Sequence, residues 1–311
     1  MTGALPYRLD FESGEPLVEW VATDGSRFTE PFFEQTIARL RRRSPANSRA
    51  RGLRTPLNAL LDVPPSVPLT ALIFHVSRCG STLLTQMLAA LPANIVASEP
   101  QIFDDILQLD PRNPTIAEED RIAWLRGAAR ALGQRPAGSA ERLFVKVACW
   151  HIFSLPLIQR AFPGVPIVFV HRHPVEVLVS LMRMPSLALV RGTVTPEQLG
   201  LTTAERDTLT REAHAAAILG ALFRAAAEHR HSLVPVAYER IPGFVSESMP
   251  GCAFNDAERI LLRTASAFDA KNPAESFTPD SGRKHNEASP AVLAAAARWA
   301  EPLYARWLAT L

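Results

Sequence analysis

Residues 74–84 of the chain read FHVSRCGSTLL. They follow an apolar run that starts at Ala71, and they lead into residues that repeat at the spacing of a buried helix face, from Leu84 to Leu91. The first N–H groups of a helix have no partner within it, so they converge on one point at the positive end of the helix dipole. The stretch therefore predicts an anion-binding turn between a buried strand and a helix.

Several residues of this turn suit the binding of an anion. Gly80 allows close approach of the backbone, Ser81 and Thr82 add hydroxyl donors, and Arg78 supplies a fixed positive charge. The turn is not a Walker A loop, GxxxxGKS/T, because the first glycine is absent and Ser81 stands where that pattern has lysine. The simpler alternative is that Gly80, Ser81 and Thr82 only cap the helix.

A second segment of the same kind surrounds Arg172. The apolar run 167–170 precedes it, and Pro174 suits a first helical turn because proline has no N–H to leave unpaired. Arg172 is then expected at a strand end, and Ser180 two turns into the helix, where its hydroxyl can reach the same ligand. The alternatives are a surface ion pair for Arg172 and an ordinary helical position for Ser180.

The composition excludes several classes of protein. The chain has 311 residues, of which 47% are hydrophobic and 21% charged, which excludes disordered, collagen-like and disulfide-stapled chains. A net charge of +2 gives no field that favours nucleic acid, and the three cysteines form no CxxC pair for a metal. We find no signal core and no apolar stretch of about 18 residues, and expect a soluble, cytoplasmic protein with no nucleic-acid or membrane partner.

From residue 69 onward, short apolar runs alternate with helical patterns. Continuous apolar strands are buried on both faces, so we expect an α/β fold of the P-loop type: three layers, with a mainly parallel central sheet covered by helices on both faces. The expected strands are 71–74, 95–97, 143–147, 166–170 and 233–238, and the expected helices are 84–91, 121–132, 154–162, 174–183, 205–230 and 290–311.

Residues 1–68 are predicted to form an N-terminal extension, separate from the main domain at 69–311. Leu17–Trp20, a turn at residues 23–25 and Arg27-Phe28 suggest a small hairpin, followed by a helix from Pro31 to Arg43 and a linker at 64–68. Seven arginines lie between residues 39 and 54. They form either a solvated helix end or an arm that contacts an anion.

The pair of strand–turn–helix segments, SRCGSTLL and RHPVEVLVS, resembles the two nucleotide-binding motifs of sulfotransferases that use 3′-phosphoadenosine-5′-phosphosulfate (PAPS). The resemblance implies a P-loop-type fold, with PAPS as co-substrate and 3′-phosphoadenosine-5′-phosphate (PAP) as product. It implies that Arg78, in place of the family's usual lysine, and Cys79, Gly80, Ser81 and Thr82 hold the 5′-phosphosulfate. It further implies that Arg172 and Ser180 bind the 3′-phosphate.

The resemblance extends, more weakly, from about Leu69 to Lys284. Ser98-Glu99-Pro100 is similar to the carboxylate-bearing segment of carbohydrate sulfotransferases, and residues 144–162 resemble the third strand–helix unit of bacterial members. Residues 236–239 resemble a strand end of the family, and Arg283 and Lys284 its basic nucleotide-binding loop, without the usual glycine spacing. Many members have a histidine two positions after the lysine that matches Lys146, and this chain has Ala148 there.

Sulfuryl transfer demands positioning and charge stabilisation, as phosphoryl transfer does. Arg78 is suited to stabilise charge on the leaving phosphate group. Lys146 is expected to point from its strand end into the site. We assign the general base to Glu99, which Pro100 is expected to keep extended, at the same sheet edge as Arg78. Burial would raise the pKa of Glu99 and a nearby cation would lower it. Glu99 as a mere ion-pair partner, or His151 as the base, are the alternatives.

The acceptor is an unidentified small molecule, sugar or peptide with a hydroxyl or amine group. Residues 185–203 and the N-terminal sixty are expected to cover its pocket. The alternative functions are an ATP-dependent P-loop small-molecule kinase, which should show a loop lysine and a strand-end aspartate for Mg²⁺, and a nucleotide-binding protein without transfer activity. No metal is expected, and the pairs His171/His173 and His229/His231 are taken as coincidence.

Overall fold

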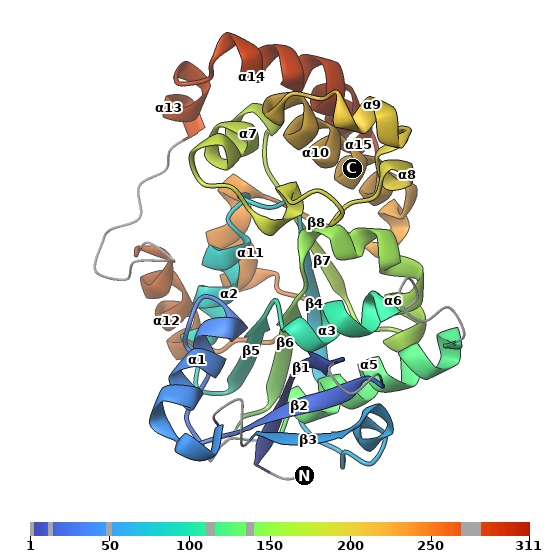
Figure 1. Ribbon diagram of the computed structural model, residues 1–311. Coiled ribbons are helices and arrows are strands. Elements are labelled where there is room, and N and C mark those ends of the chain that lie inside the picture. The colour runs from blue at the N-terminus through green and yellow to red at the C-terminus, as the bar shows by residue number, and fades with distance from the viewer. Residues whose placement is uncertain (1–2, 12–14, 48–51, 110–115, 135–139, 269–280) are drawn as a thin grey trace.

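A five-stranded parallel sheet forms the centre of the computed structural model, which describes residues 3–11, 15–47, 52–109, 116–134, 140–268 and 281–311 (Figure 1). Every neighbouring pair in this sheet is parallel. The strands lie in the order β5 (Asn94–Ser98), β6 (Arg142–Lys146), β4 (Leu69–His75), β7 (Ile167–His171) and β8 (Val234–Ala237).

Helices cover both faces of this sheet. In Figure 1, α2 (Ser81–Ala89), α11 (Ile241–Glu247) and α12 (Asp256–Ser266) lie on one side, and α3 (Gln101–Leu107), α5 (Glu118–Leu132) and α6 (Leu155–Ala161) on the other. The central strands are buried from both directions, which is why they read as continuous apolar runs. The predicted α/β fold, a P-loop-type parallel sheet between helical layers, is confirmed.

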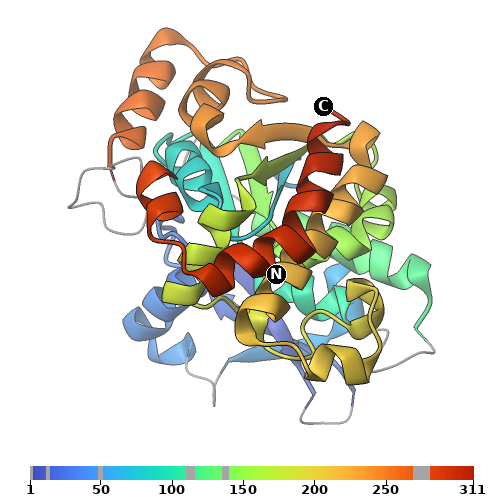
Figure 2. The ribbon, with the colours of Figure 1, turned by 90° about the horizontal axis from the view of Figure 1, so that it is seen from above.

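A further group of helices lies beyond the carboxyl ends of the strands. It comprises α7 (Pro174–Arg183), α8 (Pro196–Leu199), α9 (Thr203–Asp207), α10 (Arg211–Glu228), α13 (Ser281–Asn286), α14 (Pro290–Ala295) and α15 (Glu301–Leu308). The C-terminal helices α14 and α15 lie along α10 (Figure 2). No helix in the described ranges has the length and apolar character required to cross a membrane.

Two of the predicted helices are interrupted. The helix expected over 205–230 is broken between α9 and α10, because the Thr210 side chain accepts a hydrogen bond from the N–H of Ala213 and so caps a new helix. The helix expected over 290–311 contains a π-helical turn at Ala296–Ala300, just before Pro302. Proline has no N–H and disrupts the regular hydrogen-bond pattern of the preceding turn.

The N-terminal extension holds a three-stranded antiparallel sheet, β1 (Ala4–Asp10), β2 (Leu17–Ala22) and β3 (Leu53–Pro56), and the helix α1 (Phe33–Arg43). The predicted hairpin is wrong, because β2 pairs with β1 and β3 rather than with Arg27-Phe28. Arg27 instead donates to the carbonyls of Ala89 and Leu91, and Phe28 packs edge-on against Phe33.

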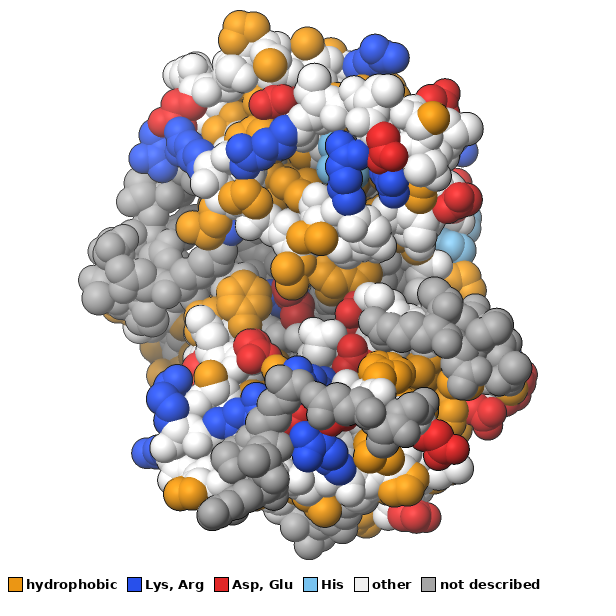
Figure 3. Space-filling model, viewed as in Figure 1, with side chains coloured by type: hydrophobic (Ala, Val, Ile, Leu, Met, Phe, Trp, Pro, Cys, Tyr) orange, Lys and Arg blue, Asp and Glu red, His pale blue; other side chains and the backbone are white. Residues whose placement is uncertain are grey.

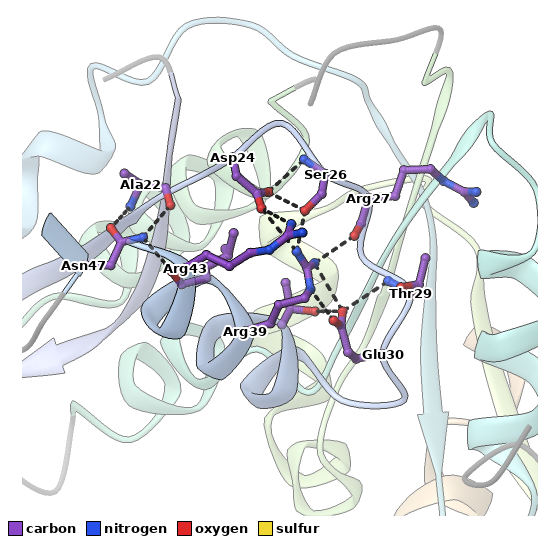
Figure 4. A network of polar contacts seen from close by, with 11 residues as sticks. Ala22, Asp24, Ser26, Arg27, Thr29, Glu30, Arg39, Arg43 and Asn47 are labelled. Carbon is purple, nitrogen blue, oxygen red and sulfur yellow. Dashed lines mark hydrogen bonds and ion pairs between the residues drawn. The ribbon is translucent and has the colours of Figure 1, made fainter. Parts of the chain in front are cut away.

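The arginines of the extension bind its own carboxylates. Figure 4 shows Arg39 bound to Glu30 and Arg43 bound to Asp24. Arg43 Nη1 and Asp24 Oδ2 are 2.6 Å apart. Arg41 pairs with Glu19, and Arg54 with Asp10. These four arginines serve the fold of the extension rather than a bound anion, while Arg49 and Arg51 lie outside the described residues.

The extension packs closely on the main domain. The N–H of Leu9 donates to Asp105 Oδ2 at 2.7 Å, and the N–H of Val67, in the predicted linker, donates to the carbonyl of Gly133 at 3.2 Å. Hydrophobic side chains from both parts form one buried core. The division of domains at residue 68 stays a prediction.

Candidate active site

Four of the predicted site residues gather at one edge of the central sheet. Arg78 follows β4, Glu99 follows β5, Lys146 ends β6 and Arg172 follows β7. All these strands are parallel, so their carboxyl ends meet at the same edge, where α/β proteins bind their ligands.

The turn between β4 and α2 has an unusual backbone. Ser77 and Arg78 have positive φ angles of 65° and 50°, and Gly80 has a φ of 87°. Side-chain-bearing residues adopt this left-handed region only where the surroundings hold them, and such residues concentrate at functional sites. Gly80 is the N-cap of α2, and no side chain forms a capping hydrogen bond there. The hydroxyls of Ser81 and Thr82 therefore do not serve as helix caps. A Cβ on Gly80 would lie 2.6 Å from the ring of Tyr238, which closes this side of the turn.

Cys79 is buried beneath the turn. Its Sγ donates to the carbonyl of Val170 at 3.2 Å and so ties the turn to β7. Burial raises the pKa of this thiol to about 11. The Cys79 thiol is therefore neutral, and its contact with an anion would come from its backbone.

The two predicted motifs meet through Arg78. Arg78 Nε donates to Ser180 Oγ at 2.8 Å, and Arg78 Nη1 lies 3.6 Å from the sulfur of Met184, the residue that follows α7. Residues 102 positions apart in the chain thus form one polar cluster.

Arg172 does form an ion pair, with Glu176, but the pair is buried rather than at the surface, since Arg172 is 3% exposed. Its guanidinium carbon lies 3.8 Å from the centroid of the Tyr238 ring, and its Nε donates to Glu176 Oε2 at 2.5 Å. Tyr238 therefore lies between the turn at Gly80 and Arg172. A buried guanidinium needs such partners, because an unpaired charge is costly to remove from water.

The helix α13 packs against α7 and carries Arg283 and Lys284, the residues matched to the family's basic nucleotide-binding loop. Lys284 is 7% exposed, whereas Arg283 is exposed and lies 3.9 Å from Glu287. His285 Nδ1 lies 3.4 Å from Glu176 Oε1, the carboxylate that also binds Arg172. Glu176 thus contacts both Arg172 and His285, and so links α13 to Arg172.

Glu99 and Lys146 form an ion pair at the other side of the turn. Lys146 Nζ is 2.9 Å from Glu99 Oε1 and 4.7 Å from the ring centroid of Phe32, which belongs to the N-terminal extension. Lys146 is 1% exposed and Glu99 30% exposed. Lys146 reaches this sheet edge, as predicted. It forms there an ion pair with Glu99, which was the alternative considered for Glu99.

The extended backbone expected for Glu99 is wrong, because its φ is 56°. The N–H of Glu99 donates to the carbonyl of Lys146 at 2.6 Å, and α3 begins only two residues later, at Gln101. The chain has to turn sharply at Glu99 to satisfy both, and these contacts outweigh the preference imposed by Pro100.

The charge environment of Glu99 is strongly positive. Burial raises the pKa of its carboxyl, but the charge of Lys146, together with the nearby His75 imidazole, outweighs burial, so the pKa lies well below its ordinary value. The sequence left open which effect prevails, and in the structure the cation Lys146 prevails over burial. Glu99 is therefore ionised at neutral pH.

His151 belongs to a neighbouring cluster. Its Nε2 lies 2.8 Å from Asp104 Oδ1, which also accepts a hydrogen bond from Trp150 Nε1 at 2.7 Å. Burial raises the pKa of the Asp104 carboxyl, but the hydrogen bond and charge of His151, followed by the Trp150 hydrogen bond, hold it below its usual range. His151 is thus oriented by a carboxylate, as a histidine base is in many enzymes.

Comparison with known families identifies the chain. Residues 72–242, more than half of it, match the model of the sulfotransferase family. The chain belongs to the sulfotransferase family. The activity of the protein is accordingly that of a transferase of the sulfotransferase class, and the predicted family is confirmed.

Two solved structures are similar to this sulfotransferase. One is a sulfotransferase from Alicyclobacillus acidocaldarius, with 17% identity, 78% of this chain and 95% of that chain covered, and a TM-score of 0.40. The other is the sulfotransferase domain of the olefin synthase of Synechococcus PCC 7002, with 14% identity, 76% and 88% covered, and a TM-score of 0.38. No curated protein sequence matches the chain.

Three residues of this sulfotransferase site escaped the sequence analysis. His75 lies 3.4 Å from Glu99, Asp104 binds His151, and Phe32 lies over Lys146. Only His75 left a signal, as a polar residue that ends an apolar run directly before the anion-binding turn. The roles of Asp104 and Phe32 depend on contacts with segments more than forty residues away.

The histidine pair at residues 171 and 173 has structural partners. His171 is buried against Trp307, 5.7 Å between ring centroids, and burial lowers its pKa to about 4. His173 caps α7 by accepting a hydrogen bond from the N–H of Val175. No three His, Cys, Asp or Glu side chains gather as a metal site in the parts of the chain that the structure covers.

Proposed function

We propose that this sulfotransferase moves a sulfuryl group from PAPS to a hydroxyl or amine group of an acceptor, with PAP as the product. The observation that carries the proposal is the hydrogen bond from Arg78 to Ser180, 2.8 Å long, which joins the two motifs at one place. PAPS carries a 5′-phosphosulfate and a 3′-phosphate, so its binding requires two adjoining groups of anion donors.

The residues at this edge suit such a ligand. The N–H groups of the turn, the Arg78 guanidinium, the Gly80 backbone and the hydroxyls of Ser81 and Thr82 would hold the 5′-phosphosulfate. Ser180 and Arg172 would hold the 3′-phosphate. Arg172 binds Glu176 through Nε and would contribute its positive charge to the phosphate. Arg283 and Lys284, on the helix beside α7, would add positive charge.

PAPS brings an activated sulfuryl group with a good leaving group, so the protein has to position the reactants and balance their charge. As the acceptor oxygen bonds to sulfur, the bond from sulfur to the bridging phosphate oxygen breaks, and Glu99 takes the acceptor's proton. Arg78 and Lys146 stabilise the negative charge left on the phosphate oxygen. His75 and Lys146 both lie near Glu99 Oε1. We therefore assign the acceptor's proton to the other carboxylate oxygen, Oε2.

The acceptor would approach through the hollow that Figure 3 shows between the part of the molecule holding α7 to α10 and the part holding α1 and β2. Hydrophobic side chains gather along its upper rim, over the segment that follows α7, where Met184, Leu187 and Val190 are 56%, 70% and 56% exposed. Met184 touches Arg78, and Phe32 of the extension touches Lys146. Leu187 and Val190 belong to residues 185–203 and Phe32 to the N-terminal sixty, the two segments expected to cover the acceptor, and Met184 directly precedes the first of them.

Ligand-dependent thermal stability tests the donor site. We expect PAP to raise the melting temperature more than AMP does, because only PAP carries the 3′-phosphate, and more than ATP with Mg²⁺ does. Stabilisation by ATP with Mg²⁺ alone would favour a kinase. The third outcome is stabilisation by PAP without transfer of labelled sulfate from PAPS to any of a pool of hydroxylated and amino compounds. That result would indicate a nucleotide-binding protein without transfer activity.

A further inference from the structure

His75 ends β4 and is almost fully buried, with 6% of its surface exposed. The N–H of Ser77 donates to His75 Nδ1 at 3.0 Å. An imidazole nitrogen that accepts a hydrogen bond carries no proton, so in the neutral ring the proton is on Nε2. Burial is the main cause that lowers the pKa of His75, which keeps the ring neutral at neutral pH.

The other nitrogen, Nε2, is buried without a well-formed hydrogen bond to the described residues, and the polar atom it lies near is the carboxylate of the proposed base. His75 Nε2 lies 3.4 Å from Glu99 Oε1, the same oxygen that Lys146 Nζ approaches at 2.9 Å. One small side chain thus contacts the anion-binding turn through one nitrogen and the Glu99 carboxylate through the other.

Both residues that His75 contacts have a strained backbone. Ser77 and Glu99 have positive φ angles of 65° and 56°. Such conformations persist where surrounding contacts fix them, and His75 supplies one contact to each. Glu99 sits on a neighbouring segment, so without His75 and Lys146 its side chain would be free to rotate in a site where it is 30% exposed.

We propose that His75 is a positioning residue that connects the donor-binding turn to the base: its Nδ1 accepts the hydrogen bond from the N–H of Ser77, and its Nε2–H, 3.4 Å from Glu99 Oε1, confines that carboxylate to the orientation that takes the acceptor's proton. This inference rests on the proposed function and deepens it. His75 does not touch the reacting atoms. It acts on donor binding through Ser77 and on proton removal through Glu99, and these two effects can be separated.

Two substitutions separate the contacts. In His75→Asn the amide oxygen takes the place of Nδ1 and keeps the Ser77 contact, while the contact to Glu99 is lost. In His75→Gln the amide nitrogen takes the place of Nε2 and keeps the Glu99 contact, while the contact to Ser77 is lost. We expect His75→Asn to lower kcat by about tenfold with PAP affinity within about twofold of wild type. We expect His75→Gln to weaken PAP binding by roughly three- to tenfold, with a smaller fall in kcat.

The decisive measurement combines His75→Asn with Glu99→Gln. If His75 acts on turnover through Glu99, His75→Asn lowers kcat in the wild type and has no further effect on kcat when Glu99 is already Gln. A histidine that only supports the fold would lower kcat by the same factor in both backgrounds, and that result would overturn the proposal. The same loss of PAP affinity in the Asn and Gln variants would also overturn it.

Controls keep this inference apart from the proposed function. His214→Asn removes a histidine of similar burial, 7% exposed, from α10 and reports the cost of losing a buried imidazole. Melting temperatures of all variants establish that they fold. A wild-type protein that neither binds PAP nor transfers sulfate from PAPS contradicts the proposed function itself. A wild-type protein that does both, with independent losses in the double variant, contradicts only the role of His75.

Discussion

Glu99 combines a left-handed backbone with a carboxylate held between Lys146 and His75. The backbone strain costs about 1–3 kcal/mol, and the surrounding contacts have to offset it. A carboxylate with a lowered pKa is a weak base in isolation, but the acceptor's proton becomes more acidic as its oxygen bonds to sulfur. The structure shows Glu99 as an ionised carboxylate paired with Lys146, so its role as the base stays a proposal, and His151, oriented by Asp104, is the competing candidate.

Replacing Glu99 by Gln tests this assignment. Gln keeps the shape of the side chain and removes the base, so turnover should fall by about 10²–10⁴ with PAP affinity nearly unchanged. Steady-state kinetics with PAPS and calorimetric titration of PAP measure the two quantities. The matched comparison is His151→Ala. If that variant is inactive while Glu99→Gln keeps near-normal turnover, the role of base belongs to His151.

Arg172→Ala should abolish most of the preference for PAP over AMP. A charge-assisted contact to the 3′-phosphate is worth roughly 1.5–3 kcal/mol, and AMP lacks this phosphate. Since the change leaves Glu176 buried without its cation, a second variant, Arg172→Gln with Glu176→Gln, removes both charges together. Arg183→Ala, a surface arginine of α7, is the control. Unchanged discrimination between PAP and AMP in both Arg172 variants would refute the assignment.

At the scale of the secondary structure elements, the turn before α2 depends on a residue without a side chain. A Cβ on Gly80 would lie 2.6 Å from the Tyr238 ring and 2.8 Å from Ile241, and the backbone there is left-handed. Both Tyr238 and Ile241 come from the segment after β8, so the turn is shaped by a strand end two positions away in the sheet.

Gly80→Ala should therefore weaken PAP binding by roughly tenfold or more and destabilise the fold by about 1–3 kcal/mol beyond the backbone strain. Gly164→Ala is the matched control, because Gly164 has a similar φ of 78° and nothing lies within 4 Å of its added Cβ. It should cost only the strain, about 1–2 kcal/mol, with PAP affinity intact. Equal effects of the two variants on PAP binding, measured by titration, would mean that Tyr238 does not confine the turn.

The contact between β7 and the C-terminal helix should make stability depend on pH. Burial beside Trp307 lowers the pKa of His171 to about 4, below the ordinary value of about 6.5, so the unfolded chain binds this proton first. The contribution of His171 to the free energy of unfolding is fully present above pH 6.5. It is lost as the pH falls towards 4, and the loss reaches about 3 kcal/mol. Urea unfolding across this range should show a shallower loss for His171→Asn. An unchanged slope would show that other groups dominate.

The predictability of each element follows from the range of the interactions that form it. The parallel strands and the turn at residues 76–81 were predictable, because continuous apolar runs and small residues before a helix are local signals. The pairing of β2 with β3, more than thirty residues later in the chain, was not, and neither was the backbone of Glu99, which is fixed by the carbonyl of Lys146. The site roles of His75 and Asp104 likewise arise from partners that only the folded chain brings together.

At the scale of the whole molecule, the N-terminal extension and the segment after α7 approach the site from two sides. Phe32 packs on Lys146 from the extension, and Met184 touches Arg78 from the end of α7. Arginines of the extension pair with its own carboxylates, and Lys146 and Arg172 at the sheet edge pair with Glu99 and Glu176. Apolar side chains of two segments thus lie beside the cations at the sheet edge, an arrangement that suits the proposed transfer from an anionic donor to a separate acceptor.

The central claim is that the two motifs form one PAPS site that transfers sulfate. Its most direct test is the transfer of labelled sulfate from PAPS to a pool of hydroxylated and amino compounds, with Glu99→Gln as the blank and ATP labelled at its γ-phosphate as the rival donor. We expect label in an acceptor product from PAPS, a stoichiometric amount of PAP, and loss of both with Glu99→Gln. Transfer of the γ-phosphate from ATP, with none of the sulfate from PAPS, would contradict it.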